Sequence, residues 1–324
     1  MATLKGQNLR IYAGKSVIGM ATNCTITLTN NTDDASTKDD VGMASKPITT
    51  SKSWQVQVES LNVSDVAMML TAIKNLTPFS LRWDEASTTD NQTGLVSTFA
   101  RAGQAYLTDA TFNFNDRENS AKSLQFTGTG AISAVASGAT TTVLPAGSYT
   151  KGQFVRLFLS DDNTAAPSKV IAAAKTLALH VSVTVENATT KDTEGEWQIQ
   201  EPTAISYDIS TNALVRSGEP IRATVQGQAL ADIETIYEAG TPVKWKIANV
   251  SGQNNRTASS TIVSGSAVLT QLTINPAPSS AAPPHSPVPD AATRATPKGA
   301  QSSRMVPPAR MAPNSRWMPT SAKS

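Results

Sequence analysis

The feature that most constrains this chain is an internal repeat. Residues 5–12 read KGQNLRIY and return at residues 151–158 as KGQFVRLF. Residues 34–39 (DASTKD) match residues 187–192 (NATTKD), and the same register places Trp54 on Tyr207. Two further pairs of blocks follow in the same order: residues 77–79 with 241–243, and residues 103–113 with 265–275. Because ordered blocks recur along the chain, the sequence predicts two diverged copies of one unit.

The repeat predicts the domain organisation. Copy one occupies residues 1–135, a linker rich in Ala, Thr, Gly and Ser occupies residues 136–150, and copy two occupies residues 151–275. The length of 324 residues is that of about two ordinary domains.

Strict alternation of apolar and polar residues predicts a mainly β fold. Cys24, Ile26 and Leu28 alternate with threonines, which is typical of a half-buried strand. We expect two tandem units, each a β-sandwich or small barrel with one short flanking helix. The helices are expected at residues 65–73, capped by Ser64, and at residues 231–238. The expected strands are 8–13, 21–30, 53–61, 79–83, 96–101, 104–113, 122–127, 154–159, 175–185, 204–209, 243–247 and 266–275.

Two segments do not show strand patterning. The polar stretch of residues 31–50 predicts a long loop. From residue 276 to 324 the chain holds 11 of its 18 prolines and six Lys or Arg, with Asp290 as the single acidic residue. This composition predicts a disordered basic tail. Copy two therefore lacks the closing strand that copy one has. The segment is either a genuine flexible tail or a departure from the original reading frame near residue 276.

Residues that carry chemistry are few. The histidines are His180 and His285, and Cys24 is the single cysteine, which excludes an intrachain disulfide. No nucleophile elbow, phosphate loop, dinucleotide fingerprint or zinc-binding His pair is present. We therefore expect no enzymatic activity, no cofactor and no metal. Trp54 and Tyr207 are interpreted as core aromatics rather than as sugar-stacking platforms.

Two alternatives concern location and calcium. Loop 31–50 contains the acidic residues Asp33, Asp34, Asp39 and Asp40, whose carboxylates are of the type that binds Ca²⁺. They lack the spacing of an EF-hand calcium loop, so a solvated loop is the preferred interpretation. No apolar run reaches the ~20 residues needed to span a membrane, and no signal peptide is apparent. We expect a protein assembled in the host cytoplasm, with no membrane partner.

The order of these elements resembles the major tail tube protein family of long-tailed bacteriophages. The resemblance covers roughly residues 1–134, through residues 6–12, the helix at 64–73, and residues 103–111 and 121–130. It implies a virion protein that forms stacked rings of six units around a lumen through which DNA passes without specific binding. It also implies partners in the tail: other copies of the chain, the tape measure, the tail terminator, and the baseplate or tip.

The resemblance further implies that long loops join one ring to the next. The candidate loops are residues 31–50 and 186–203. Their charged residues are the candidate stacking residues: Asp33, Asp34, Lys38, Asp39, Asp40, Lys191 and Asp192.

The repeat leaves two ring models open. In the favoured model each copy fills one position, and three chains complete a pseudo-hexameric ring. In the other, six chains form the ring and copy two decorates its outside. Rival functions are a surface adhesin or carbohydrate-binding β-sandwich protein, and a tube of an injection system or a baseplate-proximal tail protein.

Overall fold

The structure is a computed structural model that describes residues 9–14, 16–39, 45–63, 65–86, 94–95, 99–135, 150–160, 164–171, 174–214, 230–252 and 257–274. Residues 9–135 are called the first half below, and residues 150–274 the second half. The predicted linker, apart from Thr150, and the Pro-rich segment 276–324 lie outside the described residues, as do Asp40 and the predicted cap Ser64.

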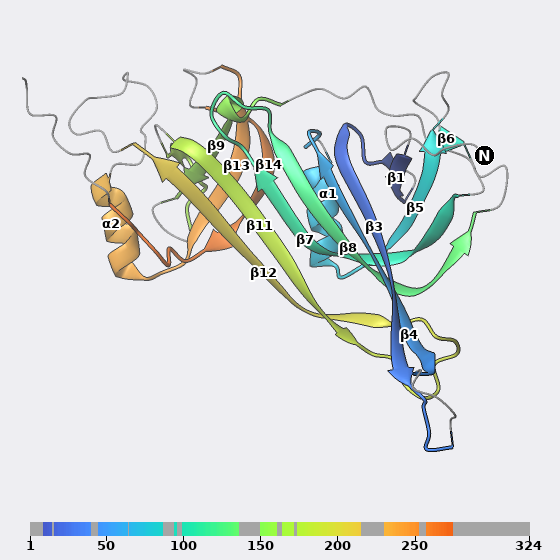
Figure 1. Ribbon diagram of the computed structural model, residues 1–324. Coiled ribbons are helices and arrows are strands. Elements are labelled where there is room, and N and C mark those ends of the chain that lie inside the picture. The colour runs from blue at the N-terminus through green and yellow to red at the C-terminus, as the bar shows by residue number, and fades with distance from the viewer. Residues whose placement is uncertain are drawn as a thin grey trace, which may run out of the picture. The chain divides into compact units, whose positions relative to one another are not determined.

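In the described part of the first half there are eight strands and one helix (Figure 1). In chain order they are β1 (Leu9–Ala13), β2 (Ser16–Val17), β3 (Ala21–Asp34), β4 (Pro47–Ser60), α1 (Val66–Lys74), β5 (Phe79–Ala86), β6 (Gly94–Leu95), β7 (Arg101–Asn113) and β8 (Ala121–Ala134).

Among the described residues, the second half repeats this order up to the equivalent of β7, without a counterpart of β6. A short 3₁₀ helix (Gly152–Phe154) leads into β9 (Val155–Leu159), β10 (Lys169–Val170), β11 (Ala174–Asn187), β12 (Gln200–Ala213), α2 (Leu230–Ala239), β13 (Val243–Val250) and β14 (Ala258–Ala267).

The predicted mainly β class is confirmed. Strand pairing in both sheets is antiparallel, and neither sheet closes into a barrel among the strands that the structure describes. Of the described strands, ten form one sheet in the order β2-β1-β5-β7-β8-β4-β3, with β6 joined to β5, β11 joined to β7 and β12 joined to β11. The other has four strands in the order β10-β9-β13-β14. Residues 1–273 form one compact unit.

Corresponding hairpins in the two halves pair in the same register. Every pair in β11–β12 carries numbers 153 higher than a pair in β3–β4, as in Leu28↔Trp54 and Val181↔Tyr207. The two register shifts recur at the same places, between Ala21 and Asn23 and between Ala174 and Thr176 at one end. A bulge is a local irregularity of one strand, so its recurrence reflects a shared detail of backbone geometry.

Strands of the four-stranded sheet also pair in the same register as their counterparts in the first half. Ile11 pairs with Trp83 in the first half, and Leu157 pairs with Ile247 in the second. Strands β13 and β14 reproduce the register of β5 and β7, including the glycines described next.

Close packing of tryptophan explains why glycine recurs in the block at residues 103 and 265. A Cβ added to Gly103 would lie 2.6 Å from the Trp54 ring, and one added to Gly265 would lie 2.8 Å from the Trp245 ring. No side chain fits at either position, so each glycine lets a large ring lie directly on the strand.

One face of the large sheet carries the core. Trp54, Val56 and Val58 on β4 are buried, and the intervening residues of that strand are exposed. Burial raises the pKa of the neighbouring Cys24 thiol to about 11. The thiol is therefore neutral near pH 7 and behaves as a small apolar side chain.

Three expected elements differ from the structure. Residues 31–34 and 47–50 belong to β3 and β4, so the predicted loop 31–50 is largely hairpin. Both faces of this part are exposed, so no apolar alternation marks it. Of the predicted strand 96–101, residues 96–98 lie outside the described residues, Phe99 and Ala100 lie outside any strand, and β7 begins at Arg101. The predicted strand 266–275 is wrong, because β14 covers Ala258–Ala267 and residues 268–274 pair with no described strand.

The first helix is held to the sheet by a buried ion pair. Its cap is Asp65, whose side chain makes no capping hydrogen bond and instead accepts one from the Lys122 ammonium. The Lys122 side chain is fully buried, and Asp65 retains 20% exposure. Val66, Met69 and Ile73 bury the inner face of the helix.

Candidate assembly surface

The two halves are joined by a shared strand pair. The end of β7 pairs with the middle of β11 over five residues, with Thr111 opposite His180 at the centre. Figure 1 shows β11 and β12 running on from β7 and β8 as parts of one sheet. On the core face of this junction, four apolar side chains are at most 5% exposed: Ala110, Phe112, Leu179 and Val181. The junction therefore joins the first half and the second half into one continuous sheet and core.

The opposite face of the junction is polar. His180 lies between two carboxylates: Nε2 is 2.7 Å from Asp109 Oδ2, and Nδ1 is 3.0 Å from Asp208 Oδ1. The hydrogen bond to Asp109 and then that to Asp208 raise the pKa of His180 above its ordinary value of 6.5. The histidine thus links β7, β11 and β12 across the boundary between the halves.

The His180 cluster predicts a pH-dependent junction. Because the folded-state pKa of His180 is raised, its contribution to stability is fully present below pH 6.5 and is lost as the pH rises through the folded-state pKa. We expect His180→Thr to reduce the difference in urea midpoint between pH 5.5 and pH 8.5. The effect is small, since the side chain is 38% exposed. An unchanged pH difference in the variant would contradict this role.

The polar face extends over six neighbouring strands. Between the core-facing residues, strands β3, β4, β8, β7, β11 and β12 carry mostly Thr, Ser, Gln and Asn. The other residues at these positions are Ala178, His180, Glu59, Asp109 and Asp208. No Lys or Arg occurs at these alternating positions, which lie within the described segments 23–31, 53–59, 123–129, 109–113, 176–184 and 206–212. The face is thus hydrophilic and weakly acidic.

The loop of the second-half hairpin binds to the first half. Lys52 donates its backbone N–H to the Glu196 carbonyl at 2.6 Å, and Gly130 donates to the Gln198 carbonyl at 2.8 Å. The Lys52 ammonium also pairs with the Glu196 carboxylate. This loop, residues 188–199, therefore forms a second contact between the halves at the end of the shared sheet.

The described candidate stacking residues lie either in strand β3 or in the turns of the two hairpins. Asp33 and Asp34 belong to β3 and pair with β4, where Asp34 accepts hydrogen bonds from the Ser36 and Lys46 backbone. Bonds from the Ser36 hydroxyl and backbone hold the pKa of Asp34 below its ordinary value. The remaining described candidates are exposed and lie in the turns of the two hairpins: Lys38 and Asp39 in the first, Lys191 and Asp192 in the second.

The chain leaves strand edges open at both ends of the shared sheet. β3 pairs with β4 alone, and β12 pairs with β11 alone, among the strands that the structure describes. In the first half β8 lies between β7 and β4. In the second half no described strand lies between their equivalents, β14 and β12. Trp54 is 1% exposed, whereas Tyr207 at the matching position is 45% exposed, so the prediction of a core aromatic is correct for Trp54 alone.

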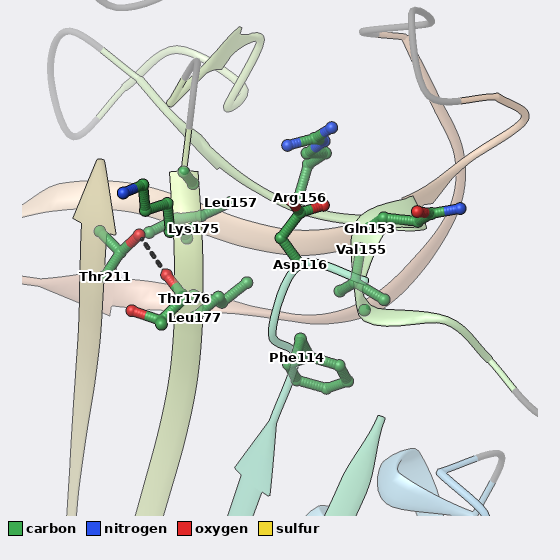
Figure 2. Close-up of a pocket in the computed structure, with 12 residues that line it drawn as sticks. Phe114, Asp116, Gln153, Val155, Arg156, Leu157, Lys175, Thr176, Leu177 and Thr211 are labelled. Atoms are coloured by element: carbon green, nitrogen blue, oxygen red, sulfur yellow. Dashed lines mark hydrogen bonds between the residues drawn. The ribbon is translucent and has the colours of Figure 1, made fainter. Parts of the chain in front are cut away.

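Figure 2 shows a hollow beside the junction between the halves. It is lined by Phe114, which directly follows β7, by apolar side chains of β9 and β11, and by the charged residues Asp116, Arg156 and Lys175. Backbone bonds close it: Phe114 donates to Leu177 and Asp116 donates to Lys175, each at 2.8 Å. The hollow therefore lies where the residues after β7 pack against β9 and β11.

The sequence did not indicate several of these contacts. The partners of His180 and the Asp65–Lys122 pair join residues far apart in the chain, and no local pattern marks them. A group of three or more His, Cys, Asp or Glu able to hold a metal ion is not found in the described ranges. Within the same ranges, no helix has the length and apolar character needed to cross a membrane.

Comparisons with known proteins give similarities among solved structures alone. No family model matches the chain, and no curated protein matches it. A solved structure described as the virion of a native gene transfer agent particle is similar to 41% of this chain and to 100% of its own chain. The sequence identity is 12% and the TM-score is 0.34, values too low to carry an argument about fold or function.

Proposed function

We propose that this chain is a structural subunit of a phage tail tube that assembles head to tail into rings. The observation that carries the proposal is the β7–β11 junction, where one unit continues the sheet of another. Among the strands that the structure describes, the counterparts of both junction edges lack this pairing: β3, the counterpart of β11, pairs with β4 alone, and residues 271–274, the counterpart of 109–112 in β7, pair with none. A head-to-tail contact repeats until the rotation closes a ring, and closure removes the exposed edges.

Duplication favours three chains per ring. The registers of the two halves agree pair by pair, including their bulges. This agreement supports the duplication and makes each half equivalent to one ring position. A second half that only decorated the outside would not need the backbone pairing that joins it to the first. Six equivalent positions then require three chains.

The polar face is proposed to line the lumen. A tube that conducts DNA must not hold its phosphates, and Lys or Arg side chains are the groups that would hold them. The alternating Thr, Ser, Gln and Asn positions with a few carboxylates meet that requirement. The apolar face would then pack on the helices and the small sheet, as Val66 and Met69 of α1 already do.

The tips of the hairpins are proposed to contact the next ring. In the first half this places Lys38, Asp39 and the neighbouring Asp33 and Asp34 at the ring interface. The second-half tip, with Lys191 and Asp192, lies beside residues 196–198, which bind the first half. The further partners would be the tape measure, the terminator and the tip proteins of a virion tail.

Electron microscopy of the concentrated, purified chain tests this function. We expect hollow tubes or stacked rings in negative stain. A glycan-binding assay on the same preparation tests the adhesin alternative. A chain that stays dispersed at high concentration and binds glycans specifically would replace the tube by the adhesin.

A further inference from the structure

The junction inside the chain specifies a junction between chains. Residues 109–113 of β7 pair with residues 182–178 of β11. The repeat relates residues 109–112 to residues 271–274, because Gly103 corresponds to Gly265. It relates residues 179–182 of β11 to residues 26–29 of β3. Applying both relations to the internal junction gives an antiparallel pair between residues 271–274 and β3, with Thr273 opposite Thr27.

We propose that residues 271–274 of one chain form a strand on the β3 edge of a second copy of this chain, in this register. The inference rests on the proposed tube function and names the contact through which rings would form. The two segments do not make this pair within one chain: among the described strands, residues 268–274 pair with none and β3 pairs with β4 alone.

The chemistry of the two junctions agrees on both faces. On the apolar face, Phe112 opposite Leu179 corresponds to Ile274 opposite Ile26. Likewise, Ala110 opposite Val181 corresponds to Leu272 opposite Leu28. On the polar face, Thr111 opposite His180 corresponds to Thr273 opposite Thr27. Cross-strand pairs of this kind, apolar with apolar and threonine with threonine, stabilise antiparallel sheets.

The exposed fractions of the apolar side chains differ between the internal junction and the proposed junction between chains. Phe112 and Val181 are 0% and 5% exposed at the internal junction. Their counterparts Ile274 and Leu28 are 43% and 58% exposed in the isolated chain. A bulky apolar side chain left more than half exposed at a strand edge is an expected docking position for another strand. Filling it with the second copy would give Leu28 the environment that Val181 has.

The internal loop contact predicts a second part of the same interface. Loop 188–199 bonds to Lys52, whose counterpart on β12 is Ile205, and Ile205 is 39% exposed. By the same relation, the tip of the β3–β4 hairpin of the second copy lies beside Ile205 of the first. Both contacts join the second half of one copy to the first half of the next copy. One neighbouring copy would therefore make both.

Disulfide cross-linking tests the register. In a Cys24→Ala background, which removes the single native cysteine, Thr27→Cys and Thr273→Cys are combined. Residues directly opposite in an antiparallel pair have Cα atoms roughly 4.5–5.5 Å apart, within the range for a disulfide. We expect oxidation to join chains into dimers and trimers, with no larger species because a ring of three closes on itself.

Two controls use the same background. Thr111→Cys with His180→Cys is the internal counterpart, and it should form a disulfide within one chain if the variant is folded. Asn31→Cys with Thr273→Cys shifts one cysteine four residues along β3, roughly 13 Å, and should remain unlinked.

The possible outcomes distinguish a failure of the proposed junction between chains from a failure of the proposed tube function. Cross-linking of the 27–273 pair alone supports the proposed register. Tubes that form without cross-linking of this pair, or with linking of the 31–273 pair, overturn the register and leave the tube function standing. Linked chains without tubes support the junction and contradict the tube. A folded chain that neither links nor assembles overturns both.

Discussion

Replacing Asp65 by alanine is expected to destabilise the folded chain by about 3–5 kcal/mol. Lys122 has no exposed side-chain surface, and Asp65 is its carboxylate partner. Removing that carboxylate leaves a buried ammonium without its counter-charge. Urea denaturation at pH 7, at a protein concentration below that of assembly, measures the loss. A loss under about 1 kcal/mol would show that the pair does not hold α1 to the sheet.

The matched control is the double change Asp65→Ala with Lys122→Met. Methionine fills a similar volume without a charge, so most of the lost stability should return. Burial lowers the pKa of Lys122, while Asp65 opposes that shift. Between the folded and unfolded pKa values the unfolded chain binds more protons, so stability rises with pH there. The defect of Asp65→Ala should therefore shrink as the pH approaches 10.

Supplying the second half with a closing strand is the other large expected effect. Residues 276–324 would be replaced by a copy of residues 114–134, which contain β8. The added strand would lie between β14 and β12, as β8 lies between β7 and β4, and would cover Tyr207. We expect the amide protons of β12 to exchange roughly 100-fold more slowly, equivalent to about 3 kcal/mol of protection.

A scrambled version of the same 21 residues serves as the control. It keeps the length and composition of the graft and removes the alternation that lets a strand pair on both edges. Assembly should begin at a lower protein concentration with the grafted strand than with the scrambled one. Equal hydrogen exchange in the two variants would contradict the proposed vacancy between β14 and β12.

The strands with one buried face were predictable from the sequence. Around Cys24 and Trp54 the alternation of apolar and polar residues marks the strand directly, and the repeat transfers it to the second half. Where both faces are exposed, as at residues 31–34, nothing in the hydrophobic pattern distinguishes a strand from a loop. The predicted ends of the strands were wrong at such places.

The assembly surface was less accessible to sequence reasoning. Local patterns do not show that β7 pairs with β11, because such pairing depends on which edges remain open after each half has folded. His180 illustrates this: its own strand is evident, whereas Asp109 and Asp208 come from two other strands. Tyr207 was expected in the core because Trp54 is there, and its exposure follows from the strand that the second half does not show.

The most direct test of the central claim is the number of chains in one layer of the assembled tube. Cryo-electron microscopy of the tubes gives the layer spacing, and mass per length from scanning transmission measurements then gives the mass of each layer. With a chain of 34.0 kDa, the account predicts three chains per layer and pseudo-sixfold symmetry of the wall. Six chains per layer, with the second half outside the wall, would contradict it.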